Sequence, residues 1–468
     1  MKIRVKNLGA LKQAEFEIGD LTIICGANNT GKTYATYALF GFLSFWKTAL
    51  SVAISDSKVA RLLEEGAVSI NIQEYIDNAP KIIEDGCKRY VKQLPNVFAS
   101  NPRMFEETEF QVKLDHADLK PVESFEMRIG AAKNVLFSIS KARESVEVVI
   151  TLLAEKDKIR LPRDIIKQSI GDAIKDIIFG RLFPHPFIAS AERTGAAIFR
   201  KELNFARNRL LEQMSSREKK IDPIELLTKV YADYALPVKT NVDFTRQLEG
   251  FAKRESFISR EHPQLLDDFT NIIGGEYSVT RNDELYYIPK GKRIKLTMDE
   301  SSSAVRSLLD IGFYLRHAAQ RGDLLMVDEP ELNLHPENQR RVARLFARLV
   351  NIGVKVFITT HSDYIIKELN TLIMLNHDRA NLKKIMEEEG YKPEELINPD
   401  TIRVYIAEEA PVKLDGRVRK GNHMTLVDAE IDTELGIEAR SFDKTIDEMN
   451  RIQEAILFSG EEQESCSI

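Results

Sequence analysis

The octapeptide GANNTGKT at residues 26–33 constrains the fold more than any other stretch, because it fits the pattern G-x-x-x-x-G-K-[ST]. So short a pattern also arises by chance, and an ordinary glycine-containing turn is the alternative. The flanking residues favour the first interpretation. The run LTIIC at 21–25 is apolar and bounded by Asp20 and Gly26, as in a buried strand. The proline-free run KTYATYALFGFL, from Lys32 onward, predicts a helix.

A glycine-rich loop between a strand and a helix can surround a phosphate chain with backbone N–H groups. Lys32 would neutralise the β- and γ-phosphates of a nucleotide, and the Thr33 hydroxyl would reach Mg²⁺. The residues predicted to form the loop are Gly26, Ala27, Asn28, Asn29, Thr30, Gly31, Lys32 and Thr33.

The composition is that of a globular protein, with 43% hydrophobic and 29% charged residues among 468. A net charge of −6 argues against a surface that attracts nucleic acid everywhere, although local basic patches stay possible in principle. The three cysteines, Cys25, Cys87 and Cys466, are widely spaced and form neither a disulfide framework nor a zinc pattern. This usage favours the reducing cytoplasm.

Neither a signal peptide nor a membrane span is expected. The N-terminal stretch MKIRVKNLGALKQ lacks an apolar core. The most lipid-like run, YALFGFLSFWKTALSVAI, is interrupted by Lys47, and its first half continues the helix after the loop. We therefore expect a soluble protein that does not act at a membrane.

The segment DLLMVDEPELNLHP at 323–336 supplies a second candidate site. Its apolar run, 324–327, predicts a central parallel strand. The run ends in Asp328 and Glu329, which places two carboxylates where α/β sheets bind ligands. Asp328 would hold Mg²⁺ through its water shell, and Glu329 would polarise the water that attacks a γ-phosphate. A solvated acidic turn is the alternative, which the phosphate loop elsewhere in the chain disfavours.

The following residues predict a βαβ unit. The segment 336–353 has apolar residues at helical spacing, and VKVFITTHS at 354–362 reads as another strand. Strands joined in this way are parallel, so His361 would emerge beside Glu329. A histidine there could hydrogen-bond the γ-phosphate and report its presence; a purely structural histidine is the alternative.

Serines at 301–303 open an amphipathic helix in ESSSAVRSLL, residues 300–309. A serine-rich helix N-terminus can bind a phosphate. Ser302 could equally serve as a simple helix cap, and the residues alone leave both readings open.

Taken together, these motifs resemble those of AAA-family ATPases of the ABC type, in the branch that contains the SMC and Rad50 proteins and the OLD family. The resemblance rests on NLGALKQAEFEI before GANNTGKTY, on ESSSAVRSLL, on LLMVDEPELNLHP and on FITTHSDYII. It covers residues 1–45 and 185–375. It implies an α/β fold: a P-loop ABC-type ATPase head, with a mixed sheet flanked by helices, and a largely helical insertion.

The periodicity and the resemblance together divide the chain into segments. They are an N-terminal lobe with the loop (1–45), a mixed α/β insertion (46–182), a helical arm or lid (183–273), a C-terminal lobe (274–375) and a small α/β region with an acidic tail (376–468). Within the insertion, KVARLLEEGAVSI at 58–70 reads as helix and ESVEVVITLL at 144–153 as strand.

The resemblance also implies roles. The cofactors would be ATP and Mg²⁺, with Asp328 as the Mg²⁺ carboxylate, Glu329 as the catalytic base and His361 as the switch histidine. Ser302 of one subunit would complete the ATP site of another, so the protein would be a homo-oligomer, at least a head-to-tail dimer. Two departures stand out: Ser302 is followed by Ser303 instead of glycine, and no lid glutamine can be placed. Arg193 is a candidate for that place, with a surface arginine as the favoured alternative.

A nuclease within this chain is not expected, because the acidic residues Glu408, Asp428 and Asp432 follow strands without a D-x-D pattern. The residues between the motifs number fewer than about three hundred and lack sustained a/d heptads, so a long coiled-coil arm is not expected. The chain then resembles the stand-alone OLD-like ATPases of bacterial anti-phage systems such as Septu and PARIS. This resemblance implies an ATPase subunit that holds or gates a separately encoded nuclease or toxin effector.

The main alternative is an SMC/Rad50-like DNA-repair or chromosome-maintenance ATPase that binds DNA directly; a self-contained nuclease and a transporter ATPase are further ones. The segments 199–220 and 290–293 are rich in lysine and arginine, which suits a phosphate backbone. Glutamates interrupt the first segment, however, so an ordinary solvated helix face is the favoured reading.

Overall fold

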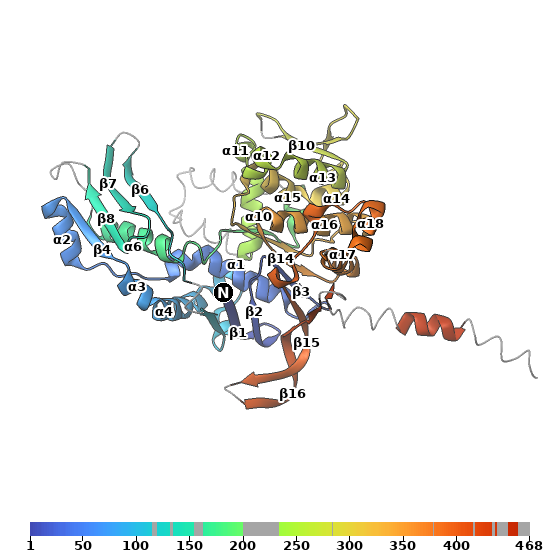
Figure 1. Cartoon of the computed structure of the whole chain (residues 1–468), viewed down its shortest axis with the longest axis horizontal. Coiled ribbons are helices and arrows are strands. Elements are labelled where there is room, and N and C mark those ends of the chain that lie inside the picture. Colours follow the sequence, from blue (N-terminus) through green and yellow to red (C-terminus); the bar gives the residue numbers. More distant parts are fainter. Residues whose placement is uncertain are drawn as a thin grey trace, which may run out of the picture. The chain divides into compact units, whose positions relative to one another are not determined.

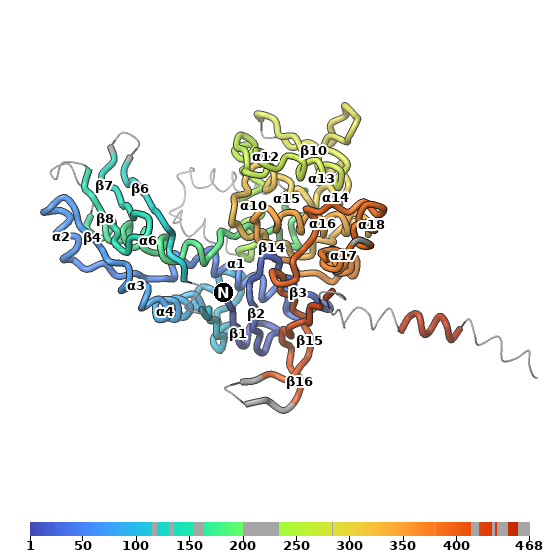
Figure 2. The backbone as a smooth tube through the Cα atoms, viewed as in Figure 1, coloured from blue at the N-terminus to red at the C-terminus, as the bar shows by residue number. Residues whose placement is uncertain are grey.

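The computed structural model describes residues 1–114, 119–131, 134–153, 162–199, 234–282, 284–377, 379–414, 417–432, 436–437 and 448–456. The chain forms two compact units. Unit 1 comprises Met1–Leu8 and Tyr37–Pro186, and unit 2 comprises Gly9–Thr36 and Phe187–Ile468. Figure 2 shows the blue N-terminal chain of unit 2 beside orange and red segments far along the sequence, where residues 21–25 pair with residues 356–360 and 402–406.

A six-stranded sheet forms the centre of unit 2, in the order β16-β15-β3-β14-β13-β9 (Figure 1). The bounds are β3 Leu21–Cys25, β9 Pro186–Ala189, β13 Leu324–Asp328, β14 Lys355–Thr360, β15 Ile402–Leu414 and β16 Arg417–Asp428. Strand β14 pairs in parallel with β13 and with β3, β3 pairs in parallel with β15, and β16 is antiparallel. Every residue of β3 and β13 is buried, as in strands covered on both faces.

Helices flank this sheet, so the predicted α/β class with a mixed sheet is confirmed. Helix α1 (Lys32–Ala49) begins directly after the loop, and its residues from Tyr37 onward belong to unit 1. The other helices of unit 2 are α7 Arg193–Ile198, α10 Leu236–Arg246, α11 Leu248–Phe251, α12 Phe257–Glu261, α13 Pro263–Ile273, α14 Ser303–Ser307, α15 Leu309–Phe313, a π-helical turn Tyr314–Ala318, α16 Pro336–Asn351, α17 Asp363–Met374 and α18 Ala380–Glu389.

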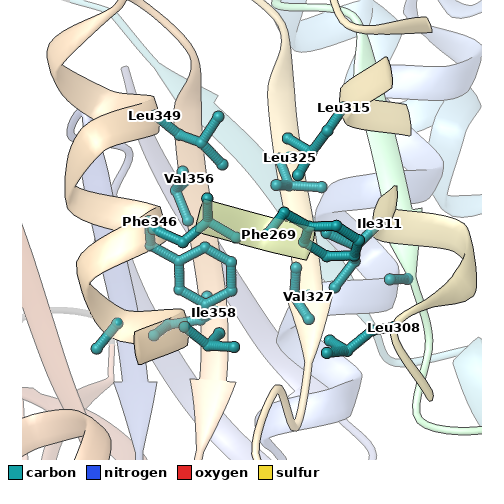
Figure 3. Close-up of a cluster of buried hydrophobic side chains, with 14 of the residues drawn as sticks. Phe269, Leu308, Ile311, Leu315, Leu325, Val327, Phe346, Leu349, Val356 and Ile358 are labelled. Carbon is teal, nitrogen blue, oxygen red and sulfur yellow. The ribbon is translucent and has the colours of Figure 1, made fainter. Parts of the chain in front are cut away.

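The core of unit 2 lies between the sheet and these helices. Figure 3 shows side chains of β13 and β14 pointing toward α13, α16 and residues 308–315. Leu325 and Val327 alternate along β13, so they share one face of the sheet, and Phe346 of α16 meets that face fully buried. The βαβ unit predicted from residues 324–362 is therefore present, with β13 and β14 parallel and α16 between them in sequence.

Smaller elements complete unit 2. The predicted alternation over 277–297 forms an antiparallel meander of β10 Gly275–Val279, β11 Leu285–Pro289 and β12 Leu296–Thr297. Strand β2 (Leu11–Glu17) lies beside β16, with Thr425 Oγ1 donating a 2.5 Å hydrogen bond to the Gln13 carbonyl. A short antiparallel pair joins β17 Ile431–Asp432 to β18 Gly436–Ile437.

Unit 1 contains both strands and helices. A four-stranded antiparallel sheet has the order β4-β8-β7-β6, and β1 pairs antiparallel with β5. The bounds are β1 Lys2–Leu8, β4 Ala67–Asn71, β5 Glu109–Lys113, β6 Phe125–Ala131, β7 Asn134–Lys141, β8 Glu147–Leu152, α2 Asp56–Glu65, α3 Gln73–Asp77, α4 Ala79–Val91, α5 Leu94–Phe98 and α6 Arg163–Phe179. In this unit the ring of Phe42 contacts those of Tyr90, Phe110 and Phe183, and Tyr90 also contacts Phe110.

One predicted helix is only half helical. The pattern of residues 58–70 predicts a continuous helix, but α2 ends at Glu65. Gly66 takes the left-handed conformation (φ 82°) and donates its N–H to Leu62 O, which is a common helix C-cap. The residues after it form β4, where Val68 and Ile70 alternate inward and pair with β8.

Several other predictions have more limited outcomes. The basic segment 199–220 lies outside the described residues except for Phe199, and so does Cys466. Cys25 and Cys87 are buried free thiols. Within the described ranges, no helix combines the length and apolar character needed to cross a bilayer.

Candidate functional site

The loop 26–33 connects β3 to α1, as its flanks predict. Gly26 has φ 140° and Gly31 has φ 93°, so both need the conformational freedom of glycine. A Cβ on Gly26 would lie 2.7 Å from the Ala407 carbonyl oxygen, so a side chain does not fit there without movement. Ala27, Asn28 and Asn29 are exposed at the tip of the loop.

Lys32 is folded back over the loop. Its Nζ donates to the carbonyl oxygens of Gly26 at 2.9 Å and Ala27 at 2.7 Å, and its side chain is buried. Burial lowers the pKa of Lys32, while the negative charges of Glu329, Asp328 and Glu331 act in the opposite direction. The ammonium group therefore lies close enough to these carboxylates to interact with their charge, although they are about three hundred residues away in the sequence.

The sheet register brings these groups together. Asp328 is aligned with Thr359 across the β13–β14 pair, and Thr360 is aligned with Cys25 across the β14–β3 pair. The residues that follow these three strand ends are Gly26, Glu329 and His361. Because the strands are parallel, their carboxyl ends share one edge of the sheet, which is where ligands bind in α/β folds.

Asp328 is nine-tenths or more buried and incompletely hydrogen-bonded. Its Oδ1 accepts a short hydrogen bond from the Thr359 hydroxyl, and its buried Oδ2 has no hydrogen-bond partner. The pKa of Asp328 is raised to about 6, mainly by burial and also by the charge of the neighbouring Glu329, against the lowering effects of the Thr359 hydrogen bond and of Arg193. A buried oxygen without a partner is costly, so Oδ2 is available to a ligand.

These oxygens fit a Mg²⁺ ion. Asp328 Oδ2 and the hydroxyl of the exposed Thr33 are hard oxygen donors, and Mg²⁺ in nucleotide sites takes only one or two carboxylates, with water and phosphate oxygens as its other ligands. Among the residues that the structure places, no group of three or more His, Cys, Asp or Glu side chains is arranged to hold a metal ion.

Glu329 has an unusual backbone conformation. Its φ is 50°, in the left-handed region that residues with a side chain seldom adopt. Its N–H donates to Thr359 O at 3.0 Å, and its carbonyl accepts from Leu332 N at 3.2 Å. Its carboxylate Oε1 lies 3.8 Å from His361 Nδ1, so the structure does bring these two predicted residues together.

Glu331 is a third carboxylate of this site that the sequence reasoning did not single out. Its Oε1 accepts from the Thr360 hydroxyl at 2.9 Å and the His361 N–H at 2.7 Å, and lies 3.2 Å from His361 Nδ1. It therefore fixes the end of β14 to the loop after β13. The signal was present, because DEPE contains a further glutamate two residues after Glu329.

Ser302 acts as a helix cap within its own chain. It is exposed, and its hydroxyl oxygen accepts from Val305 N at 3.3 Å at the start of α14. This is the capping interaction, one of the two roles for Ser302 between which the sequence alone could not decide. The capping geometry does not test whether Ser302 also binds the phosphate of another subunit, so that role stays a prediction.

Arg193 is buried, and the favoured reading of a surface arginine is wrong. Only 1% of the residue is exposed, and it is the first residue of α7. Its guanidinium donates to the carbonyl oxygens of Ser190, Ser307, Asp328 and Glu329 at 2.7–2.8 Å. The local pattern ASAERTG did not reveal this burial, because three of the four carbonyl acceptors, those of Ser307, Asp328 and Glu329, lie more than a hundred residues further along the chain.

Asp310 is a buried carboxylate in α15, and neither of its oxygens has a hydrogen-bond partner. Burial raises its pKa from 3.8 to about 7, and the charge of Arg193 opposes this rise. The folded state therefore binds a proton at Asp310 more tightly than the unfolded state does. Its contribution to stability is complete below about pH 4 and is lost as the pH rises to about 7.

We predict that Asp310→Asn removes this pH dependence. The parent should lose up to about 1.4 kcal/mol of stability per pH unit from this group between about pH 4 and 7, because ionisation leaves a charge in a buried position. Thermal melts of the variant and the parent at pH 5, 6, 7 and 8 measure it. The variant should gain in Tm relative to the parent as the pH rises, and a Tm difference that is equal at all four pH values would contradict the prediction.

The comparison with protein families agrees with the geometry of the site. The AAA ATPase domain family matches residues 1–366, which include the loop, both carboxylates and His361. No curated protein matches the sequence.

Similar solved structures include three SMC head domains. An Smc head bound to the C-winged helix domain of ScpA is 12% identical, with 91% of this chain and 97% of that chain covered and a TM-score of 0.32. The Pyrococcus furiosus Smc head with an extended coiled coil, bound to the C-terminal domain of ScpA, is 13% identical, with 97% of this chain and 98% of that chain covered and a TM-score of 0.30. The Thermotoga maritima SMC head is 10% identical, with 92% of this chain and 98% of that chain covered and a TM-score of 0.28. At these identities and scores, no property of those proteins transfers to this chain. The family match, in contrast, spans residues 1–366 of 468, and the chain belongs to the AAA ATPase domain family.

Proposed function

We propose that this chain binds ATP with Mg²⁺ and hydrolyses it to ADP and phosphate. The observation that carries the proposal is that Lys32, Asp328, Glu329 and His361 lie together at the carboxyl ends of the parallel strands β3, β13 and β14. The loop 26–33 would surround the phosphates with its N–H groups, and the helix N-terminus at Lys32 favours their negative charge.

Each residue at this edge would have a separate role in ATP binding or hydrolysis. Lys32 exchanges its two carbonyl partners for β- and γ-phosphate oxygens. Thr33 and Asp328 would hold Mg²⁺, which supplies positive charge where phosphate charge develops. Glu329 would take the proton of the attacking water, and His361 would contact the γ-phosphate from the end of β14.

We further propose that two copies form composite sites, with Ser302 of one copy facing the nucleotide of the other. The exposure of Ser302 and its position at a helix start are compatible with this arrangement. The support comes from the resemblance of residues 300–309 to the ABC signature. The minimum assembly is then a head-to-tail dimer, and larger homo-oligomers could be built from such dimers.

For the biological role, we propose an ATPase subunit of a bacterial anti-phage complex that holds or gates a separately encoded nuclease or toxin effector. The support is the likeness of the motif set to stand-alone OLD-like ATPases. The alternative is an SMC/Rad50-like ATPase that binds DNA directly, and the basic residues within 199–220 and 290–293 are its support.

Affinity purification of Glu329→Gln distinguishes these roles, because a variant that holds ATP keeps an ATP-dependent complex together. The chain is expressed with its native flanking genes, purified, and analysed by mass spectrometry of the peptides and of the intact complex. A nuclease or toxin-like protein at fixed stoichiometry, absent with Lys32→Ala, supports the effector proposal. A dimer that carries DNA and no second protein supports the alternative instead.

A further inference from the structure

We propose that Arg193 is a positioning residue for ATP hydrolysis: it holds the backbone of Asp328 and Glu329 in place and ties it to the signature helix α14. This inference rests on the proposed function and deepens it, because it assigns a role to a residue that touches neither nucleotide nor water.

The first observation is the bonding of the guanidinium. Nη1 donates to Asp328 O at 2.7 Å, and Nη2 donates to Glu329 O at 2.8 Å, so one planar group holds two successive peptide carbonyls. Nε donates to Ser307 O at 2.7 Å, at the last residue of α14. Nη1 also donates to Ser190 O, just after β9. Arginine suits this task because its donors form a rigid, planar fork.

The second observation is the strain at one of the residues held. Glu329 has φ 50°, a left-handed conformation that is strained for a residue with a side chain. Such a conformation persists only where several contacts fix it. Thr359 O fixes the Glu329 N–H, and Arg193 and the Leu332 N–H fix its carbonyl. Without the arginine, the Glu329 peptide loses its only charged partner among these three.

The third observation concerns the charge of Arg193. A fully buried guanidinium needs compensation, and here its four hydrogen bonds go to neutral carbonyls. Its charge instead interacts with the carboxylates of Asp310, Asp328, Glu331 and Glu329, in decreasing order of effect on its pKa, which burial lowers. Arg193 thus interacts by charge with Asp310 of α15, while its hydrogen bonds go to the end of α14, to Ser190 and to the carbonyls of Asp328 and Glu329.

These contacts give Arg193 an effect on turnover that a merely packed residue lacks. A shift of the Glu329 peptide moves the carboxylate away from the position for water attack, and misplacement of a catalytic group by about 1 Å can cost about 100-fold in rate. The four hydrogen bonds of Arg193 go to Ser190, Ser307, Asp328 and Glu329, outside the loop 26–33, so nucleotide binding should survive the loss of Arg193.

The test compares Arg193→Lys with Arg348→Lys as the matched control. Arg348 is also buried and charged, but it pairs with Asp268 and Glu394 instead of the carboxylate strand. We expect Arg193→Lys to lower kcat at least about 10-fold, with the Kd for ATP changed less than about 3-fold. Arg348→Lys should change neither to that extent. Lysine keeps the charge and much of the volume, which favours a folded protein.

A double-mutant cycle separates positioning from general damage. In the Glu329→Gln background, Arg193→Lys should slow the residual turnover by less than about 3-fold, because the two changes remove the same function. Equal slowing in both backgrounds, or loss of ATP affinity in step with kcat, would overturn the inference and leave Arg193 as a scaffold residue.

A second readout does not depend on hydrolysis. Amide hydrogen exchange of nucleotide-free protein should rise at least about 10-fold for residues 329–332 in Arg193→Lys and should stay unchanged in β14. The reason is that the Leu332 amide donates to the Glu329 carbonyl, which Arg193 then no longer holds, and that the Glu329 amide depends on its bond to Thr359 O. Unchanged exchange at 329–332 overturns the inference. Absence of Lys32-dependent ATP turnover in the parent contradicts the proposed function instead, so the two failures are distinguishable.

Discussion

Lys32→Ala is expected to abolish ATP binding at concentrations that saturate the parent. In the nucleotide-free protein, Nζ of Lys32 satisfies the carbonyl oxygens of Gly26 and Ala27 at 2.9 and 2.7 Å. With ATP bound, the same group would make charge-assisted bonds to two phosphates, each worth about 1.5–3 kcal/mol. Loss of both corresponds to at least about a 100-fold rise in Kd.

Titration of the protein with ATP by calorimetry measures this effect. Lys47→Ala is the matched control, because Lys47 lies on the same helix α1, is about half exposed and pairs with Asp176. That variant should bind ATP like the parent. A thermal melt of Lys32→Ala checks that the loop defect has not unfolded the chain. Equal ATP affinity in Lys32→Ala and the parent would refute the site assignment, whatever the biological role.

The parts of the site that follow local patterns could be predicted from the sequence. The strand, loop and helix at 21–49 are continuous in the chain, and so is the βαβ unit at 324–360. Parallel pairing then places His361 near Glu329 without knowledge of any other contact, and Nδ1 lies 3.8 Å from Oε1. Local periodicity is enough when the covalent connection itself dictates the geometry.

What depends on distant segments could not be predicted. The burial of Arg193 requires Ser307 and Asp328 beside it, and neither is near it in sequence. The role of Glu331 depends on the donors Thr360 and His361, which come from another strand of the sheet. Likewise, the helix predicted across Gly66 ends there because β8 offers β4 a pairing partner. Tertiary contacts override local propensity in each case.

Glu329→Gln is expected to separate binding from turnover. Glutamine has the same shape, and every backbone bond at this position, including that from Arg193 to the carbonyl, is independent of the side chain. ATP affinity should therefore stay within about 3-fold, because the change removes no phosphate ligand. The amide cannot accept the proton of the attacking water, and loss of a general base costs about 10²–10⁴-fold in kcat.

Glu331→Gln is the comparison that makes this result specific. The two glutamates are two residues apart, and both carboxylates lie within 4 Å of His361 Nδ1. An amide oxygen at 331 can still accept from Thr360 and His361, so this variant should lose less activity than Glu329→Gln. Single-turnover measurements show which of the two variants hydrolyses ATP more slowly, and native mass spectrometry in the presence of ATP shows whether either forms a dimer. If Glu331→Gln is the slower enzyme, Glu331 is the base and Glu329 the support. If Glu329→Gln is slower and also accumulates as an ATP-bound dimer, both the base and the composite site are supported, since only a nucleotide held between two copies ties slow turnover to assembly.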